Sequence, residues 1–188
     1  MRKLNYVFIL SLIFLLLSGC SDEEIQPKSL DSGDDVSLKS AKTKHYVPFK
    51  ATFEVYVDKV IRVSPPPKMQ EVIGVGNATH LGLTEILMEQ SWWPPALPIE
   101  LPFTGTGIGK VTFTAANGDK LLAEYDDATA IHKGPTSPLV TVKFTGHFIG
   151  GGTGRFEKAE GTFEYNGIYN KVTNEGTGTL TGKIMYHK

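Results

Sequence analysis

The chain has 188 residues, and its 19 lysine and arginine residues nearly balance its 20 aspartate and glutamate residues, giving a formal net charge of −1. This balance, with no stripe of basic residues, argues against a nucleic-acid-binding protein. Because Cys20 is the one cysteine in the sequence, no disulfide can form within the chain. The fold must therefore be stabilised by a buried core.

Residues 1–19 have the pattern of a secretory signal peptide. Arg2 and Lys3 precede an apolar run from Tyr6 to Leu17, and small residues follow that run. A single transmembrane helix is the alternative, but the run is shorter than the roughly 20 residues that span a bilayer, and no positively charged stop-transfer cluster follows it. The pattern therefore favours a signal that is cleaved during export.

The sequence Leu17-Ser18-Gly19-Cys20 resembles the lipoprotein box of bacterial lipoproteins. The resemblance implies that Cys20 becomes the first residue of the mature protein and carries a diacylglyceryl thioether, with acyl chains such as palmitate. It also implies a cell-envelope protein that is attached to the outer membrane through this lipid. Because the cysteine abuts the signal and has no histidine nearby, we expect an attachment point rather than a reactive thiol.

Residues 20–44 are predicted to form a flexible tether. Asp22, Glu23 and Glu24 make an acidic patch that resembles the signal for surface export of some Gram-negative lipoproteins, although a solvated linker would also be acidic. From Ile25 to Lys44 few large apolar residues occur, and they show no period, so this segment cannot bury enough surface to fold. The remaining residues, 45–188, form one domain of about 140 residues, which is large enough for a core.

The domain shows the alternation of β-strands throughout. Between Phe49 and Val57, apolar side chains alternate with polar ones, and Pro65-Pro66-Pro67 ends this first strand. The pair Asn117-Gly118 is typical of a two-residue hairpin turn. No segment has a convincing helical period. Further strands are predicted at residues 70–75, 80–90, 110–115, 120–125, 140–149, 161–167 and 177–187.

About eight strands joined mostly by short turns predict an all-β fold, either a calycin-like antiparallel barrel or a β-sandwich. Glycines inside the strand patterns favour the barrel, because closing a small barrel requires bends and close approaches of the backbone. These glycines are Gly74, Gly76, Gly82, Gly146, Gly178 and Gly182.

Candidate site residues lie on the strand predicted at 80–90. Three leucines occupy the same alternate positions as Glu85 and Glu89, so all five side chains are expected on one face of the strand. The two carboxylates therefore lie either in an apolar lumen, where one would serve as a general acid, or outside the barrel if the alternation slips at a bulge. His80 either binds a carbonyl group at the end of the barrel or points into a pocket. The five histidines lack the spacing of metal ligands, so we predict no metal or other cofactor.

Trp92 and Trp93 open a proline-rich segment that is predicted to be a loop from Ser91 to Pro102. Long loops in a compact domain are often functional. Adjacent tryptophans can stack on a sugar or cover an apolar pocket, which makes this pair the best candidate for specificity. In the alternative, the two rings only pin the loop onto the domain.

The sequence Gly150-Gly151-Gly152-Thr153-Gly154-Arg155-Phe156, followed by Ala159-Glu160-Gly161-Thr162, resembles the glycine-rich segment of allene oxide cyclase-like and dirigent-like barrels. Thr79-His80-Leu81-Gly82 and Ala116-Asn117-Gly118-Asp119 are similar to segments that accompany it in secreted bacterial proteins. The resemblance implies a barrel whose lumen binds an apolar or aromatic molecule. It assigns no catalytic residue to this chain, because no position matches those of the enzymes.

Two functions are consistent with these features. The first is a lipid-anchored binding module that holds a small apolar molecule or a glycan in the lumen or at the tryptophan loop. The second is a cofactor-independent cyclase or isomerase, because holding a reactive substrate in a productive shape is itself a form of catalysis. Either function leaves the oligomeric state open. The candidate ligand-binding residues are Trp92, Trp93, His80, Glu85 and Glu89.

Overall fold

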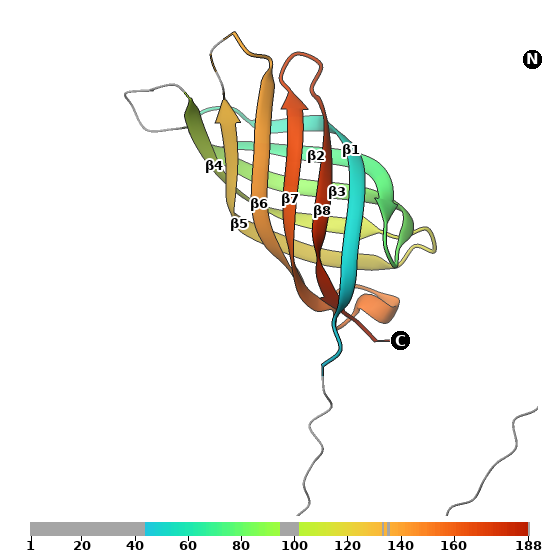
Figure 1. Cartoon of the computed structure of the whole chain (residues 1–188). Helices are drawn as coiled ribbons and strands as arrows, with labels where there is room; N and C mark the ends of the chain where they lie inside the picture. Colours follow the sequence, from blue (N-terminus) through green and yellow to red (C-terminus); the bar gives the residue numbers. More distant parts are fainter. Residues whose placement is uncertain (1–43, 95–101, 133, 135, 188) are drawn as a thin grey trace, which may run out of the picture. The chain divides into compact units, whose positions relative to one another are not determined.

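The computed structural model describes residues 44–94, 102–132, 134 and 136–187. Within these residues, eight antiparallel strands follow one another around a closed barrel, and one 3-10 turn, η1 (Gly154–Phe156), precedes β7 (Figure 1). The predicted signal peptide, the acylation site Cys20 and the tether up to residue 43 lie outside the described residues. The strands are β1 (Val47–Arg62), β2 (Lys68–Ala78), β3 (Gly82–Trp93), β4 (Phe103–Thr114), β5 (Lys120–His132), β6 (Leu139–Ile149), β7 (Glu160–Asn170) and β8 (Glu175–Met185).

The barrel closes where the first strand meets the last. Phe53 of β1 pairs with Gly76 of β2 on one side and with Gly178 of β8 on the other. Because β1 is hydrogen-bonded on both sides, the sheet has no free edge, whereas a sandwich of two open sheets would have several. The predicted all-β barrel is therefore confirmed, and the sandwich alternative is wrong.

Alternation along each strand sends apolar side chains into the lumen. In β1, Phe49, Ala51, Phe53 and Val55 are buried and the residues between them are exposed. This is the pattern that the sequence predicted for the first strand, and it follows from the two-residue period of a pleated strand.

The connection between β4 and β5 is a hairpin, as predicted, but its turn is longer than two residues. Residues 115–119 separate the two strands. A two-residue turn of the predicted type needs a positive φ angle at both central residues. Gly118 has a φ of 85°, but Asn117 is outside the left-handed region. Its side-chain Oδ1 instead accepts a hydrogen bond from the backbone N–H of Asp119 at 3.1 Å.

One end of the barrel, here termed the closed end, is filled with aromatic side chains. The ring centroid of Phe113 lies 6.2 Å from those of Phe49 and Phe148 and 5.9 Å from that of Phe53. Phe156, from η1, is fully buried and completes the packing. Edge-on and tilted ring pairs of this kind add to the stabilisation from apolar burial.

The glycine-rich segment before η1 is held against the start of β5. The backbone N–H of Thr153 donates to the carbonyl of Lys120 at 2.9 Å, and the N–H of Lys120 donates to Thr153 Oγ1 at 2.8 Å. Gly152 lies so close to β5 that an added Cβ would be blocked by the Lys120 carbonyl oxygen. The glycine at this position is therefore required by close backbone contact.

Replacing Gly152 with valine should destabilise the protein by about 1 to 3 kcal/mol, because the new side chain would overlap backbone atoms and force the segment away from β5. Denaturant unfolding followed by circular dichroism measures the change. Gly134→Val is the matched control, since among the described residues no atom lies within 4 Å of the Cβ position at Gly134. Unchanged stability of Gly152→Val would contradict the tight packing of this segment.

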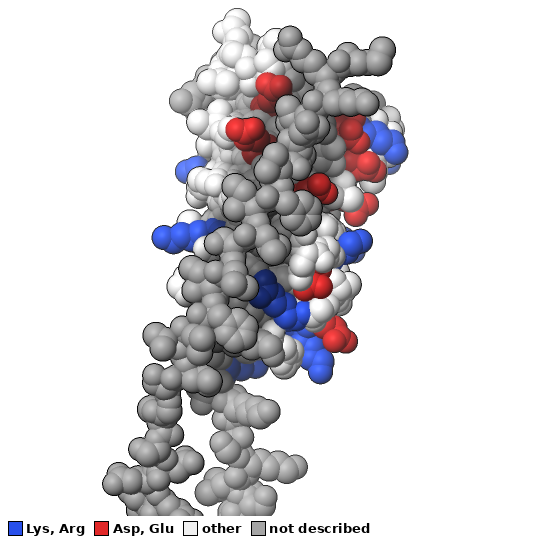
Figure 2. All heavy atoms as spheres, turned by 90° about the vertical axis from the view of Figure 1, so that its right-hand side faces the viewer, with Lys and Arg blue, Asp and Glu red and all other residues white. Residues whose placement is uncertain are grey.

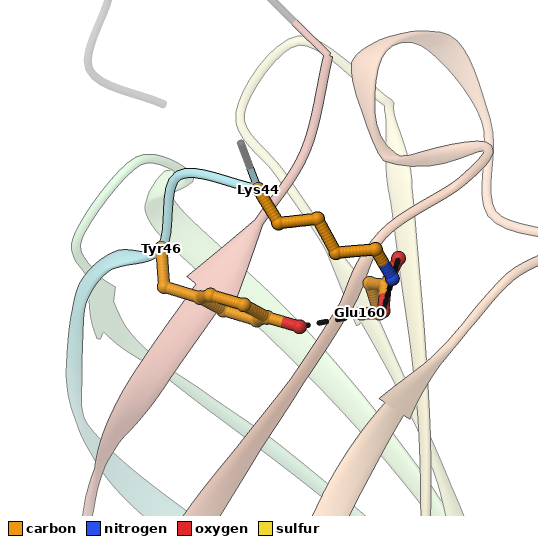
Figure 3. Close-up of polar contacts among 3 residues, drawn as sticks. All are labelled: Lys44, Tyr46 and Glu160. Carbon is orange, nitrogen blue, oxygen red and sulfur yellow. Dashed lines mark hydrogen bonds and ion pairs between the residues drawn. The ribbon is translucent and has the colours of Figure 1, made fainter. Parts of the chain in front are cut away.

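The chain enters the barrel at the closed end, where three polar side chains meet (Figure 3). Lys44 Nζ donates to both carboxylate oxygens of Glu160 at 2.7 Å, and the hydroxyl group of Tyr46 donates to Glu160 Oε2 at 3.3 Å. The bond from Lys44 holds the pKa of Glu160 below its usual value, and Glu160 raises the pKa of Lys44. Because the groups are exposed, the pair mainly orients the entering chain.

Candidate functional site

A pocket of about 450 Å³ lies inside the barrel at the end opposite to the closed end. It is termed the open-end pocket. Its wall comes mostly from inward-facing residues of β1 to β7, and it also includes residues that follow β1, β3 and β7. Trp93 and Ile168 contribute to it from exposed positions of their strands. Most of the wall is apolar, and the large apolar side chains include Val55, Val57, Val72, Met88, Trp92, Val140, Val142, Phe144 and Ile168.

Three stacked rings lie where the pocket meets the filled half of the barrel. The centroid of Phe144 lies 4.1 Å from that of Tyr125 and 4.6 Å from that of Tyr165, and the ring planes are within 20° of each other. Phe144 and Tyr165 also line the pocket. Burial raises the pKa of Tyr165 to about 12 and also raises the pKa of Tyr125. Both phenols therefore stay protonated at neutral pH.

Glycines at inward positions of β4 allow aromatic side chains to lie close to the wall of the barrel. Gly105, Gly107 and Gly109 alternate along this strand, and they place no side chain in the lumen. An added Cβ at Gly107 would lie 2.6 Å from the Trp92 ring, and one at Gly109 would lie 2.5 Å from the hydroxyl oxygen of Tyr125. The aromatic side chains therefore lie against bare backbone, which keeps them near the wall and leaves the centre open.

Polar groups inside the pocket are few and come from neighbouring strands. The Tyr125 hydroxyl donates to Gln90 Oε1 at 2.8 Å. Gln90 pairs across the sheet with Gln70, which is 8% exposed. Within the described residues, Gln70 Oε1 and Trp92 Nε1 are buried and have no hydrogen-bond partner. Buried polar atoms are nearly always hydrogen-bonded, so these two atoms are candidates for ligand contact.

Basic residues lie on three sides of the pocket's mouth. Lys68 begins β2, His132 ends β5, and Lys171 follows β7, and all three line the pocket. Burial lowers the pKa of Lys68. Burial and the nearby charge of Lys171 lower the pKa of His132. No aspartate or glutamate is among the described residues that line the pocket, so the lining formed by these residues carries a net positive charge.

Trp92 and Trp93 both line the open-end pocket. The prediction that they belong to a loop is wrong, because β3 continues through Trp93 and pairs Trp92 with Gly107 of β4. The ladder continues because the prolines begin only after Trp93, at Pro94. The proline-rich residues 95–101 lie outside the described part of the chain. The tryptophan rings are thus placed by a strand.

His80 lies at the closed end, in the turn before β3, and does not line the pocket. Its Nε2 lies 2.9 Å from the carbonyl oxygen of Pro48, and its ring packs 5.4 Å from that of Tyr186. The backbone carbonyl of His80 accepts a hydrogen bond from Arg155. His80 therefore has the first of the two roles predicted for it, in which it binds a carbonyl group at the end of the barrel.

Glu85 and Glu89 are exposed on the outer face of β3. The lumen position considered for them is therefore wrong. Their outer face also carries Leu83 and Leu87, whereas Thr84, Ile86 and Met88 point inward. Leu81 precedes the strand and is buried on the other side of the turn at Gly82, which has a φ of 74°. Because of this turn, Leu81 does not belong to the in-and-out alternation of β3, although the spacing of the leucines in the sequence had suggested that it does.

No pattern in the sequence pointed to the polar and basic lining of the pocket. Gln70, Gln90, Lys68 and Lys171 become neighbours of one site only through the pairing of strands. One signal was present in the sequence: Gly105, Gly107 and Gly109 follow the two-residue period of a strand and mark a strip without inward side chains.

Figure 2 shows charges of both signs on the part of the outer surface that described residues form in this view. In the part of the chain that the structure describes, no helix has the length and apolar character needed to cross a membrane. Within the same residues, no three histidine, cysteine or acidic side chains come together as a metal site.

Comparisons with known proteins give no relatives for this barrel. No protein-family model matches the chain, and neither the characterised proteins nor the solved structures include a significant match.

Proposed function

We propose that this protein is a binding module that holds a small apolar molecule in the open-end pocket. The observation that carries the proposal is a preformed cavity of about 450 Å³ whose wall is mostly apolar. Sites for small molecules in proteins typically have volumes of about 300 to 1,000 Å³ and such a wall. We also propose that a lipid on Cys20 attaches the module to the outer membrane, on the basis of the lipoprotein box.

The wall favours an apolar ligand over a glycan. When an apolar ligand covers the valine, methionine and isoleucine side chains of the wall, apolar surface is removed from water. This removal stabilises the complex by about 25 cal/mol per Å². A sugar would instead bring many hydroxyl groups that the few polar atoms of the pocket cannot satisfy. Because the rings of Trp92 and Tyr125 are held against glycine backbone, little side-chain freedom is lost when a ligand binds.

A cyclase or isomerase is the second candidate, and one observation favours it. The Tyr165 side chain lines the pocket, and its raised pKa keeps the phenol protonated. A protonated phenol in an apolar cavity can donate a hydrogen bond to a carbonyl or epoxide oxygen of a substrate. Mass spectrometry of a co-purified ligand after incubation separates the two candidates, because an enzyme would convert it and Tyr165→Phe would slow the conversion.

The binding proposal is tested with the neutral fluorescent probe N-phenyl-1-naphthylamine. The protein is the mature chain from residue 20 with Cys20→Ser, so that no acyl chain is attached. Its two tryptophans, Trp92 and Trp93, both line the pocket. All tryptophan emission therefore originates at this end of the barrel, so energy transfer to the probe reports binding near it, and the pocket variant below assigns that binding to the lumen. We expect Ala130→Phe, which adds a ring to the wall, to weaken binding by about tenfold or more.

Val75→Phe is the matched control, because Val75 is exposed on the outer face of β2. It adds a ring of similar size without changing the pocket. Circular dichroism checks that both variants fold. Absence of probe binding, or equal loss of binding in the two variants, would contradict a ligand site in the lumen.

A further inference from the structure

The polar end of the ligand can be inferred from the charges at the mouth of the pocket. Lys68 and Lys171 line the mouth from two different strand ends, and His132 lies near Lys171. Neither lysine has an ion pair with any described residue. Lys59, on the outside of the same end, does have one, with Glu71 at 3.9 Å. Among the described residues, the two lysines at the mouth thus lack the carboxylate partner that this outer lysine has.

Lys68 is only half exposed, and this burial penalises its charged form. A partly desolvated ammonium group without a counter-charge is unfavourable, and an anion that enters the mouth would remove the penalty. The apolar wall below the mouth would at the same time take up an apolar body. Together the two features fit a molecule with a charged group at one end and an apolar body at the other.

We propose that the natural ligand is an amphipathic anion, with its apolar body in the lumen and a carboxylate, sulfonate or sulfate group between Lys68 and Lys171. The inference rests on the proposed binding function and goes further by naming the class of ligand. Charge-assisted hydrogen bonds from the two ammonium groups would fix the orientation of the ligand, with the anionic end at the mouth.

A pair of matched probes tests this inference. 8-Anilino-1-naphthalenesulfonate has the same rings as N-phenyl-1-naphthylamine and adds one sulfonate group. In the double variant Lys68→Gln and Lys171→Gln, we expect the Kd of the sulfonate probe to rise by about tenfold and the Kd of the neutral probe to change by less than about twofold. Lys59→Gln is the matched control, because it removes a charge at the same end outside the pocket, and it should change neither Kd.

Raising the salt concentration should weaken binding of the sulfonate probe and leave the neutral probe unaffected, because salt screens the exposed part of the charge interaction. Equal effects of the double variant on both probes, or no effect on either, would overturn the inference. Those results leave the binding function intact as long as the neutral probe binds and Ala130→Phe blocks it. Failure of the neutral probe to bind would instead overturn the proposed function.

Discussion

Replacing Phe113 with alanine should lower the free energy of unfolding by about 3 to 5 kcal/mol. The Phe113 side chain is 1% exposed, and its ring contacts the rings of Phe49, Phe53 and Phe148. Removing the ring would leave a cavity among side chains that are fixed on β1 and β6. Because those strands are held by the closed barrel, they cannot move in to fill the cavity.

Denaturant unfolding followed by circular dichroism measures this loss. Leu83→Ala is the control, because Leu83 is 65% exposed on the outside of β3 and should change stability by less than about 0.5 kcal/mol. Phe113→Leu keeps part of the volume and gives an intermediate value if the alanine variant fails to fold. Similar small losses for Phe113→Ala and Leu83→Ala would show that the closed end does not form the main core.

The protein should lose stability above pH 10 because of its two stacked tyrosines. In the unfolded chain a tyrosine ionises near pH 10, whereas burial raises the pKa of Tyr165 to about 12 in the folded protein. The unfolded state therefore binds fewer protons than the folded state in this range, and stability falls as the pH rises. For Tyr165, a shift from 10 to about 12 corresponds to a loss on the order of 1 kcal/mol by pH 11. Tyr125 adds to the loss, since its pKa is also raised.

Unfolding free energies at pH 8 and pH 11 measure this effect. The double variant Tyr125→Phe and Tyr165→Phe should lose less stability between these two pH values than the unmodified protein. Tyr46→Phe is the control, since the Tyr46 ring is exposed at the chain entry. A pH dependence that is identical in the double variant and the unmodified protein would show that these phenols are not the source.

The barrel was predictable because its strands alternate strongly between inward and outward residues. Every strand overlaps a predicted one, but β4 begins earlier than the expected residue 110, since Gly105, Gly107 and Gly109 give no hydrophobic signal. The prolines after Trp93 also led to the expectation that β3 ends before the tryptophans. The ends of the strands were thus misplaced where small or rigid residues replaced the usual pattern.

The site was less predictable than the fold. The sequence drew attention to Trp92 and Trp93, which line the pocket, because two adjacent indole rings are unusual in any environment. It could not decide which face of β3 points inward, since leucines lie on the outer face beside Glu85 and Glu89. Lys68 and Lys171 are separated by about a hundred residues along the chain, and no local pattern joins them. Only the order and pairing of strands around the barrel does so.

The chain enters and leaves the barrel at the closed end, where Lys44 is bonded to Glu160 and the backbone N–H of His187 donates to the carbonyl of Arg155. The mouth of the pocket is at the other end. A purification tag, a fusion partner or a sensor chip could therefore be joined at either side of residues 44–187 without covering the mouth. Because both ends of residues 44–187 lie opposite the mouth, protein that is immobilised through either end would keep its mouth accessible to the ligand.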